Sequence, residues 1–184
     1  AGTENVFVRF SGCNLRCAIE PGPLSPGGFD CDTEFESGTE HTLDSLVHWI
    51  REEAENCRWV LLTGGEPGLQ IDKPLIEQLH SEGFKIAVET NGSIRLPDGI
   101  DYIAVSPKVA EHCIRQTTAD EVRYVRGYGQ GIPQTQVTAG HYLISPAFNG
   151  NEVDRRTLEW CEKLVRENPP WRLSIQQHKI LGIR

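Results

Sequence analysis

Residues 59–92, WVLLTGGEPGLQIDKPLIEQLHSEGFKIAVETNG, contain the pattern that decides the fold. The run WVLLT (59–63) is short and continuously apolar, which is typical of a buried strand, and TGGEPG follows it as a tight turn. PLIEQLHSEG predicts a helix that ends at Gly83, and FKIAVE (84–89) predicts a second strand with TNG as its turn. A strand, a helix and a strand in this order predict a βαβ unit with parallel strands.

The same alternation extends along the rest of the chain. A helical face recurs from Thr42 onward, and a second helix is expected from about Asp154 to Glu167. Residues 126–140 have no periodicity and predict a loop or a short hairpin. Further strands are expected at VFVRF (6–10), DYIAVS (101–106), EVRYV (121–125), HYLIS (141–145) and WRLSI (171–175). We therefore expect an α/β fold, a shortened partial (β/α) barrel with about six parallel strands and few helices.

Length and composition limit the class of protein. A chain of 184 residues with 38% hydrophobic content fits one domain, residues 1–184. It begins with alanine and contains no methionine, so we expect it to lack the extreme N-terminal segment of a longer product. The net charge of −8, with scattered basic residues, argues against nucleic acid or an anionic membrane as a partner. No apolar run approaches the roughly 20 residues that span a bilayer, so we predict a cytoplasmic protein with a small-molecule partner.

Three of the six cysteines, Cys13, Cys17 and Cys31, lie within CNLRCAIEPGPLSPGGFDC (13–31). Three thiolates on one loop can hold three irons of a 4Fe-4S cluster and leave the fourth iron open. A zinc site or three unrelated thiols are the alternatives that the spacing leaves open. Cys161 falls on the apolar face of a predicted helix and is expected to be a core residue.

Four unusual loops follow predicted strands: CNLRC, TGGEPG, ETNG and SPK. In parallel α/β folds the carboxyl ends of the strands carry the functional loops, so these four predict one site. The glycines of TGGEPG let backbone amides approach a ligand, and Glu66 can accept a hydrogen bond from an ammonium or hydroxyl group. Glu89 ends an apolar strand, where it reaches either solvent or a polar ligand.

With these motifs in order, the sequence resembles the radical S-adenosylmethionine (SAM) enzymes. Within them it resembles the 7-carboxy-7-deazaguanine synthase family. The resemblance rests on FVRFSGCNLRC, CDTEF, LLTGGEPGLQ, IAVETNGS, VSPK and WRLSIQQHKILGIR, and so spans almost the whole chain.

The resemblance implies a reaction. A reduced 4Fe-4S cluster would cleave SAM to a 5′-deoxyadenosyl radical, which abstracts hydrogen from 6-carboxy-5,6,7,8-tetrahydropterin. The ring then contracts to 7-carboxy-7-deazaguanine, ammonia leaves and SAM is regenerated. Members of the family act in queuosine and 7-deazapurine biosynthesis, use Mg²⁺, take electrons from a reductant such as flavodoxin or ferredoxin, and usually form homodimers.

The resemblance also implies roles for individual residues. Cys13, Cys17 and Cys31 would hold the cluster, and Thr33 would hold Mg²⁺. SAM would contact Gly64, Gly65, Glu66, Asn91, Ser106 and Lys108. The substrate would contact Arg9, Thr63, Gly65, Glu89, His178 and the terminal carboxylate of Arg184, with Glu89 and His178 as catalytic groups.

The chain departs from the family pattern at three places. A glutamine-glycine-glutamate-glycine segment that the family pattern leads us to expect just upstream of AGT is absent. Its cysteines are separated by three and then thirteen residues, so 18–30 carries an insertion, and Ser145-Pro146 stands where relatives often have a glutamine before the proline. The alternative functions are another small radical SAM enzyme, such as a glycyl-radical activase, a zinc-stabilised binding module and an electron-transfer iron-sulfur protein.

Overall fold

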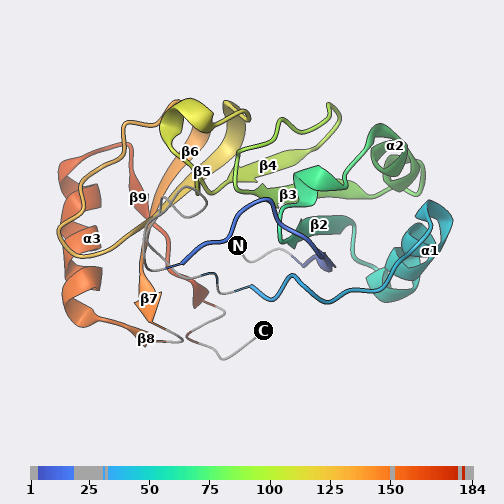
Figure 1. Cartoon of the computed structure of the whole chain (residues 1–184), viewed down its shortest axis with the longest axis horizontal. Helices are drawn as coiled ribbons and strands as arrows, with labels where there is room; N and C mark the ends of the chain where they lie inside the picture. Colours follow the sequence, from blue (N-terminus) through green and yellow to red (C-terminus); the bar gives the residue numbers. More distant parts are fainter. Residues whose placement is uncertain (1–3, 19–30, 32, 150–151, 178–179, 181–184) are drawn as a thin grey trace.

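The computed structural model describes residues 4–18, 31, 33–149, 152–177 and 180. One seven-stranded sheet has the order β1-β2-β3-β4-β5-β6-β9, and all its neighbouring strands are parallel (Figure 1). Its strands are β1 (Val6–Phe10), β2 (Trp59–Gly64), β3 (Lys85–Thr90), β4 (Tyr102–Val105), β5 (Thr118–Arg126), β6 (Thr138–Pro146) and β9 (Arg172–Leu173). The α/β class predicted from the sequence is confirmed, with seven strands where about six were expected.

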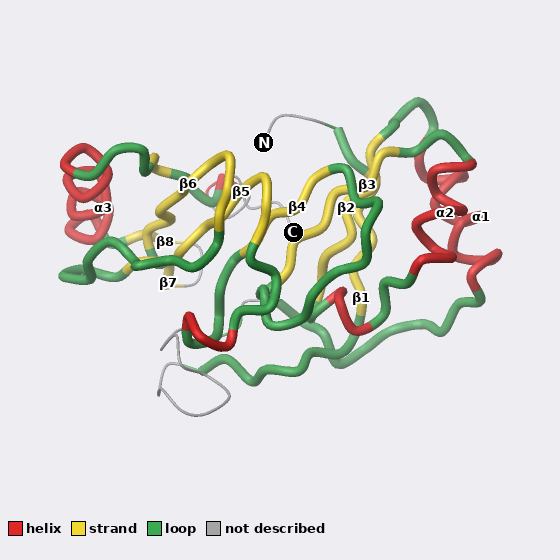
Figure 2. The backbone as a smooth tube through the Cα atoms, turned by 90° about the horizontal axis from the view of Figure 1, so that it is seen from above, coloured by secondary structure: helices red, strands yellow, loops and turns green. Residues whose placement is uncertain are grey.

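Each α-helix begins at a side chain that caps it. Thr42 Oγ1 accepts a 3.2 Å hydrogen bond from the N–H of Ser45 at the start of α1 (Leu43–Ala54). Asp72 and Asp154 do the same for α2 (Lys73–Ser81) and α3 (Arg155–Glu167). Figures 1 and 2 show α1 and α2 together at one end of the sheet and α3 at the other. Among the described residues, no helix combines the length and apolar character that crossing a bilayer requires.

Two apolar clusters pack between the sheet and these helices. The first includes Val60, Leu62, Ile86 and Val88, all without exposed surface, and lies against α1 and α2. The second contains Val122, Ile144 and the fully buried Cys161 of α3, which confirms that Cys161 is a core residue. Because successive side chains of a strand point to opposite faces, the residues between these positions lie on the face away from the helices. We call this the open face of the sheet.

The segment 126–140 is not a hairpin. Arg126 ends β5 and Thr138 begins β6, and the two strands are parallel, so residues 127–137 form a crossover without a helix. Val137 is 2% exposed, and the indole N–H of Trp160 on α3 donates to the carbonyl oxygen of Gln130. This loop therefore packs over the second cluster, where a crossover helix would otherwise lie.

Three short elements were not predicted: the 3₁₀ helices η1 (Pro67–Leu69) and η2 (Glu111–Cys113), and a small hairpin of β7 (Phe148–Asn149) and β8 (Glu152–Val153). Two- and three-residue elements are too short to leave a periodic signal in the sequence.

Candidate active site

The predicted loops meet at one rim of the sheet, at the carboxyl ends of β1 to β4. The N–H of Gly65 donates to the carbonyl of Phe10 (3.0 Å), and the N–H of Glu66 donates to the carbonyl of Gly12 (2.9 Å). The N–H of Ser106 donates to the carbonyl of Thr90 at 2.8 Å. Backbone hydrogen bonds thus tie the glycine turn to the cysteine loop, and the turn after β4 to the end of β3.

Gly64 and Gly65 are required by this close approach. Gly64 has φ +118°, a conformation that residues with a Cβ rarely adopt, and a Cβ there would clash with the backbone of Phe10. A Cβ on Gly65 would clash with the carbonyl of Gly12. Both glycines therefore let the turn after β2 lie directly against the cysteine loop.

Glu66 is fully buried, and protein donors occupy its carboxylate. Oε1 accepts from the hydroxyl of Thr90 (2.6 Å) and the N–H of Gly68 (3.0 Å). Oε2 accepts from the N–H of Asn91 (2.7 Å). Burial raises the pKa of Glu66, although these hydrogen bonds oppose the rise. The carboxylate thus joins two loops of the rim, a role that the sequence did not indicate.

Asn91 links the ETNG loop to the cysteine loop. Its amide donates to Oδ1 of Asn14 at 3.1 Å, and the amide of Asn14 donates to the hydroxyl of Ser93 at 2.8 Å. Lys108 Nζ donates to Ser106 Oγ at 3.0 Å on the neighbouring loop. Asn14 and Ser93 were not predicted, although both lie inside the quoted motifs CNLRC and ETNGS.

The three predicted cluster ligands lie on one loop, and none of them is in a disulfide. Cys13 and Cys17 are half-buried, and Cys31 is exposed. The N–H of Cys31 donates to the carbonyl of Cys17 at 3.4 Å, which brings the third cysteine back beside the second. Burial raises the pKa of the Cys13 thiol, with the negative charges of Glu66 and Cys31 adding to the rise. Within the described ranges, no group of three His, Cys, Asp or Glu side chains is already arranged to hold a metal ion.

The loop nevertheless fits an iron-sulfur cluster in its donor chemistry. The loop carries three thiols, and one of them, Cys13, lines a hollow of about 450 Å³ together with Ser11, Gly12, Arg16, Phe35 and Glu36. The guanidinium of Arg16 lies 5.0 Å from the ring centre of Phe35 and supplies a positive charge next to the thiols. A thiol that coordinates iron is deprotonated, so the positive charge of Arg16 suits the thiolate form of the ligands.

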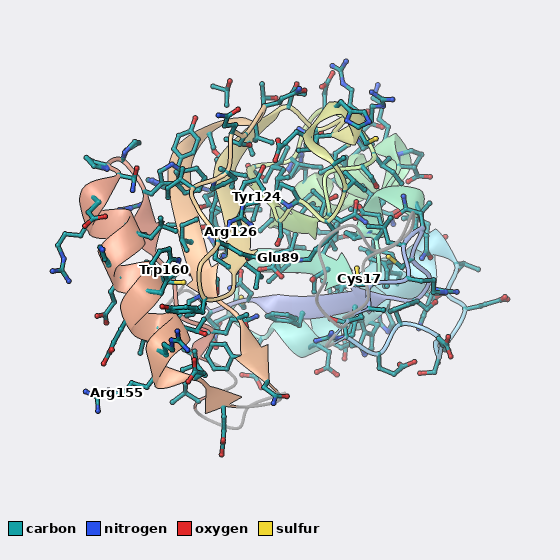
Figure 3. The ribbon with its side chains drawn as sticks, turned by 60° about the vertical axis from the view of Figure 1, so that its left-hand side comes forward. Cys17, Glu89, Tyr124, Arg126, Arg155 and Trp160 are labelled. Carbon is teal, nitrogen blue, oxygen red and sulfur yellow. The ribbon has the colours of Figure 1, made fainter. Side chains whose placement is uncertain are left out.

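The predicted substrate residues of the first three strands share the open face. Arg9 pairs with Thr63 across β1 and β2, and Thr63 Oγ1 donates to Oε2 of Glu89 on β3 at 3.2 Å. The side chain of Glu89 is 42% exposed. Figure 3 shows Glu89 on the sheet and Cys17 on the loop that follows β1.

Three other predicted site residues lie outside this face or outside the described residues. Thr33, the predicted Mg²⁺ ligand, is half-buried, and its backbone carbonyl accepts a hydrogen bond from Cys31 Sγ. His178 and Arg184 lie outside the described residues.

Three further polar side chains lie on the open face and were not predicted: Tyr102, Glu121 and Arg123. Arg123 forms an ion pair with Glu121 and lies 4.0 Å from Glu89, measured from Nη1 to Oε1. The hydroxyl of Tyr102 donates to Glu121 at 3.3 Å. The alternation of EVRYV separates Glu121 and Arg123 from buried Val122, but the sequence gives no distance to a residue on β3.

A second hollow, of about 490 Å³, lies at the opposite end of β1. It is lined by Glu4, Asn5, Val6, Phe7, Trp49, Glu53, Ala54, Glu55, Asn56 and Cys57. None of these is a predicted site residue, and the hollow is separate from the rim described above.

Comparison with known proteins identifies the relatives of this chain. It is 39% identical to the 7-carboxy-7-deazaguanine synthase of Bradyrhizobium diazoefficiens, over 100% of this chain and 91% of that protein. It is also 39% identical to the 7-carboxy-7-deazaguanine synthase of Bacteroides thetaiotaomicron, over 100% of this chain and 90% of the relative.

The crystal structure of QueE from Escherichia coli has the same fold, with a TM-score of 0.65 at 21% identity, over 96% of this chain and 86% of that chain. No family model matches the sequence. On the identity and coverage of its relatives, the chain belongs to the 7-carboxy-7-deazaguanine synthase family.

Proposed function

We propose that this chain converts 6-carboxy-5,6,7,8-tetrahydropterin to 7-carboxy-7-deazaguanine, with loss of ammonia, as a lyase of queuosine and 7-deazapurine biosynthesis. The observation that carries the proposal is the hydrogen bond between Thr63 and Glu89 on the open face, below the rim where the cysteine loop meets the glycine turn. A radical enzyme needs its substrate beside its cofactor, and this arrangement puts a polar acceptor on the sheet face whose rim carries the cysteine loop.

The cysteine loop would hold a 4Fe-4S cluster through Cys13, Cys17 and Cys31. When bound, the cluster and SAM supply the 5′-deoxyadenosyl radical that starts the reaction. Arg16, which stacks on Phe35 beside the loop, would offset part of the negative charge of the ligating thiolates.

The rim would bind SAM mainly through backbone groups and short polar side chains. The turn at Gly64 and Gly65 presents backbone without Cβ atoms, and Asn91, Ser106 and Lys108 supply amide, hydroxyl and ammonium groups. Glu66 would act by fixing the position of Asn91, since its carboxylate is buried and bonded to protein donors. Thr33 would hold Mg²⁺ through its hydroxyl.

The open face would bind the pterin. Among the described residues, Thr63 donates a hydrogen bond to Glu89 and occupies one acceptor position, so the carboxylate of Glu89 is suited to the adjacent N–H groups of an amino-pyrimidinone edge. Arg9, which is exposed, would bind the substrate carboxylate together with His178. The terminal carboxylate of Arg184 would accept a further N–H of the substrate, and Glu89 and His178 would be the catalytic groups.

The remaining expectations concern organisation and partners. We propose that residues 1–184 form one radical SAM core, that the protein works in the cytoplasm as a homodimer, and that flavodoxin or ferredoxin supplies its electrons.

The test is anaerobic reconstitution with iron and sulfide, followed by incubation with the carboxytetrahydropterin, SAM and dithionite. Mass spectrometry should detect 7-carboxy-7-deazaguanine, with more product formed than SAM consumed. Retention of zinc in place of iron would point to a structural metal module. Formation of 5′-deoxyadenosine without conversion of the pterin would point to a different radical SAM activity.

A further inference from the structure

Arg123 lies between two carboxylates that belong to different strands of the open face. Its Nη2 pairs with Oε1 of Glu121 on the same strand, and its Nη1 lies 4.0 Å from Oε1 of Glu89 on β3. Ala104 of β4 pairs with both Glu89 and Glu121 in the sheet. Because an alanine separates the two carboxylates, the guanidinium of Arg123 can reach across β4 to Glu89.

The two carboxylates are held very differently. Glu121 is 13% exposed and also accepts from the hydroxyl of Tyr102, whose pKa is raised to about 12 by burial and by the charge of Glu121. Glu89 is 42% exposed, and the hydrogen bond that it accepts comes from Thr63. A carboxylate has about four acceptor positions, so the donors in the described part of the chain leave most of those on Glu89 to a ligand. Glu121 and Tyr102 therefore anchor Arg123, while Glu89 faces the site.

This arrangement is not optimal for stability alone. Nε of Arg123 is buried and, within the described part of the chain, has no hydrogen-bond partner. Buried donors without partners are rare in folded proteins because their lost hydration is not compensated. The ion pair with Glu121 explains the place of Nη2, but it explains neither the unpartnered Nε nor the approach of Nη1 to Glu89, so the position of the guanidinium indicates a role beyond folding.

We propose that Arg123 is a positioning residue, which orients Glu89 and compensates its negative charge when a flat heterocycle with adjacent N–H donors covers it. This inference rests on the proposed function, because that function assigns a pterin to Glu89. A bound pterin displaces water from the carboxylate and makes the nearby positive charge more important. At 4.0 Å, the guanidinium supplies this charge and leaves the acceptor positions of Glu89 to the ligand.

A double-mutant cycle on cluster-loaded protein tests the inference. Equilibrium binding of the carboxytetrahydropterin is measured with SAM but without reductant, so that no turnover occurs. Arg123→Gln should weaken binding by about tenfold, which is the size of a typical coupling between contacting residues. Arg123→Lys should recover part of this loss because it keeps the charge but not the planar fork. Arg155→Gln, in a side chain that is 90% exposed on α3, is the matched control and should leave binding unchanged.

The decisive comparison is made in the Glu89→Gln background. There the additional change Arg123→Gln should weaken binding by less than about twofold, because the group through which Arg123 acts has lost its charge. If the full loss persists without the Glu89 carboxylate, or if Arg123→Gln binds like the wild type, the inference is wrong while the proposed function stands. If wild-type protein that carries the cluster fails to bind the pterin, the proposed function is wrong and the inference falls with it.

Discussion

Glu66 and Asn91 belong to different loops, and the backbone N–H of Asn91 donates a 2.7 Å hydrogen bond to the buried carboxylate of Glu66. The hydroxyl of Thr90 and the N–H of Gly68 complete the set of donors. The loop that follows β3 is therefore held by a side chain of the loop that follows β2. The binding of any ligand group that contacts Asn91 therefore depends indirectly on Glu66, because Glu66 fixes the position of Asn91.

Glu66→Gln should lower both stability and SAM affinity. A glutamine offers one oxygen to donors that now bond two, so at least one buried backbone N–H loses its acceptor. The cost is about 1 to 3 kcal/mol, which we expect to exceed the gain from removing a buried charge. Urea unfolding should show the loss, and Glu77→Gln, a 65% exposed residue of α2, is the matched control. Equal unfolding midpoints for the two variants would contradict this role for Glu66.

Gly65→Ala should disturb the contact between the glycine turn and the cysteine loop. The added Cβ clashes with the carbonyl of Gly12, so one of the two loops has to move. Overpacking of this kind costs about 1 to 3 kcal/mol, and we expect iron loading to fall with it. Gly131→Ala is the control, since a Cβ at Gly131 meets nothing within 4 Å. Thermal unfolding and iron content measured on both proteins check the prediction, which fails if they match.

Cys31→Ala should prevent assembly of an intact 4Fe-4S cluster. The remaining thiols, Cys13 and Cys17, cannot supply the three ligands that the site requires. Iron analysis and the visible absorbance of the reconstituted protein provide the measurement. Cys113→Ala is the comparison, because Cys113 is also an exposed free thiol but lies in η2. Indistinguishable iron content in the two variants would remove Cys31 from the ligand set.

Asp101 should make stability depend on pH. Burial alone would raise the pKa of Asp101, but hydrogen bonds from the N–H of Ile86 and from His80 outweigh it and lower the pKa below the ordinary 3.8. The stabilisation is therefore present above about pH 4 and is lost as the pH falls through the lowered pKa.

Comparison of the wild type with Asp101→Asn measures this effect. The side chain is 33% exposed and solvent screens the charge, so we expect a difference of about 0.5 to 1 kcal/mol at pH 7. The difference should shrink below about pH 4, as the wild-type carboxyl becomes protonated. Asp98→Asn in an exposed loop is the control. A difference that grew on acidification would show the wrong sign for a lowered pKa.

Local signals in the sequence were sufficient to predict most of the architecture. The apolar run at 59–63 predicts β2, and Thr42 and Asp154 mark helix starts because the cap and the periodic face are encoded within a few residues. The gathering of the loops at one rim follows from parallel strand direction alone. The crossover at 127–137 could not be predicted, since its position depends on packing against α3.

The same distinction between local sequence signals and long-range packing applies to the site residues. Glu89 ends an apolar run and was recognised, whereas Arg123 becomes relevant only once sheet order places β5 two strands from β3. Glu66 was assigned to the ligand because the motif does not reveal how many protein donors reach its carboxylate. Sequence motifs thus predict which residue types are present at the rim. Long-range contacts decide which of these side chains remain free to bind a ligand.

The cysteine loop is closed at its base by two backbone hydrogen bonds, from Gly12 to Phe35 and from Cys31 to Cys17. These bonds connect positions on both sides of 18–30, so the spatial relation of the second and third cysteines does not depend on how many residues separate them. Doubling the length of such a segment costs only about 0.6 kcal/mol of closure entropy. A search pattern that demands a fixed interval between these cysteines would therefore pass over chains that retain the same ligand loop.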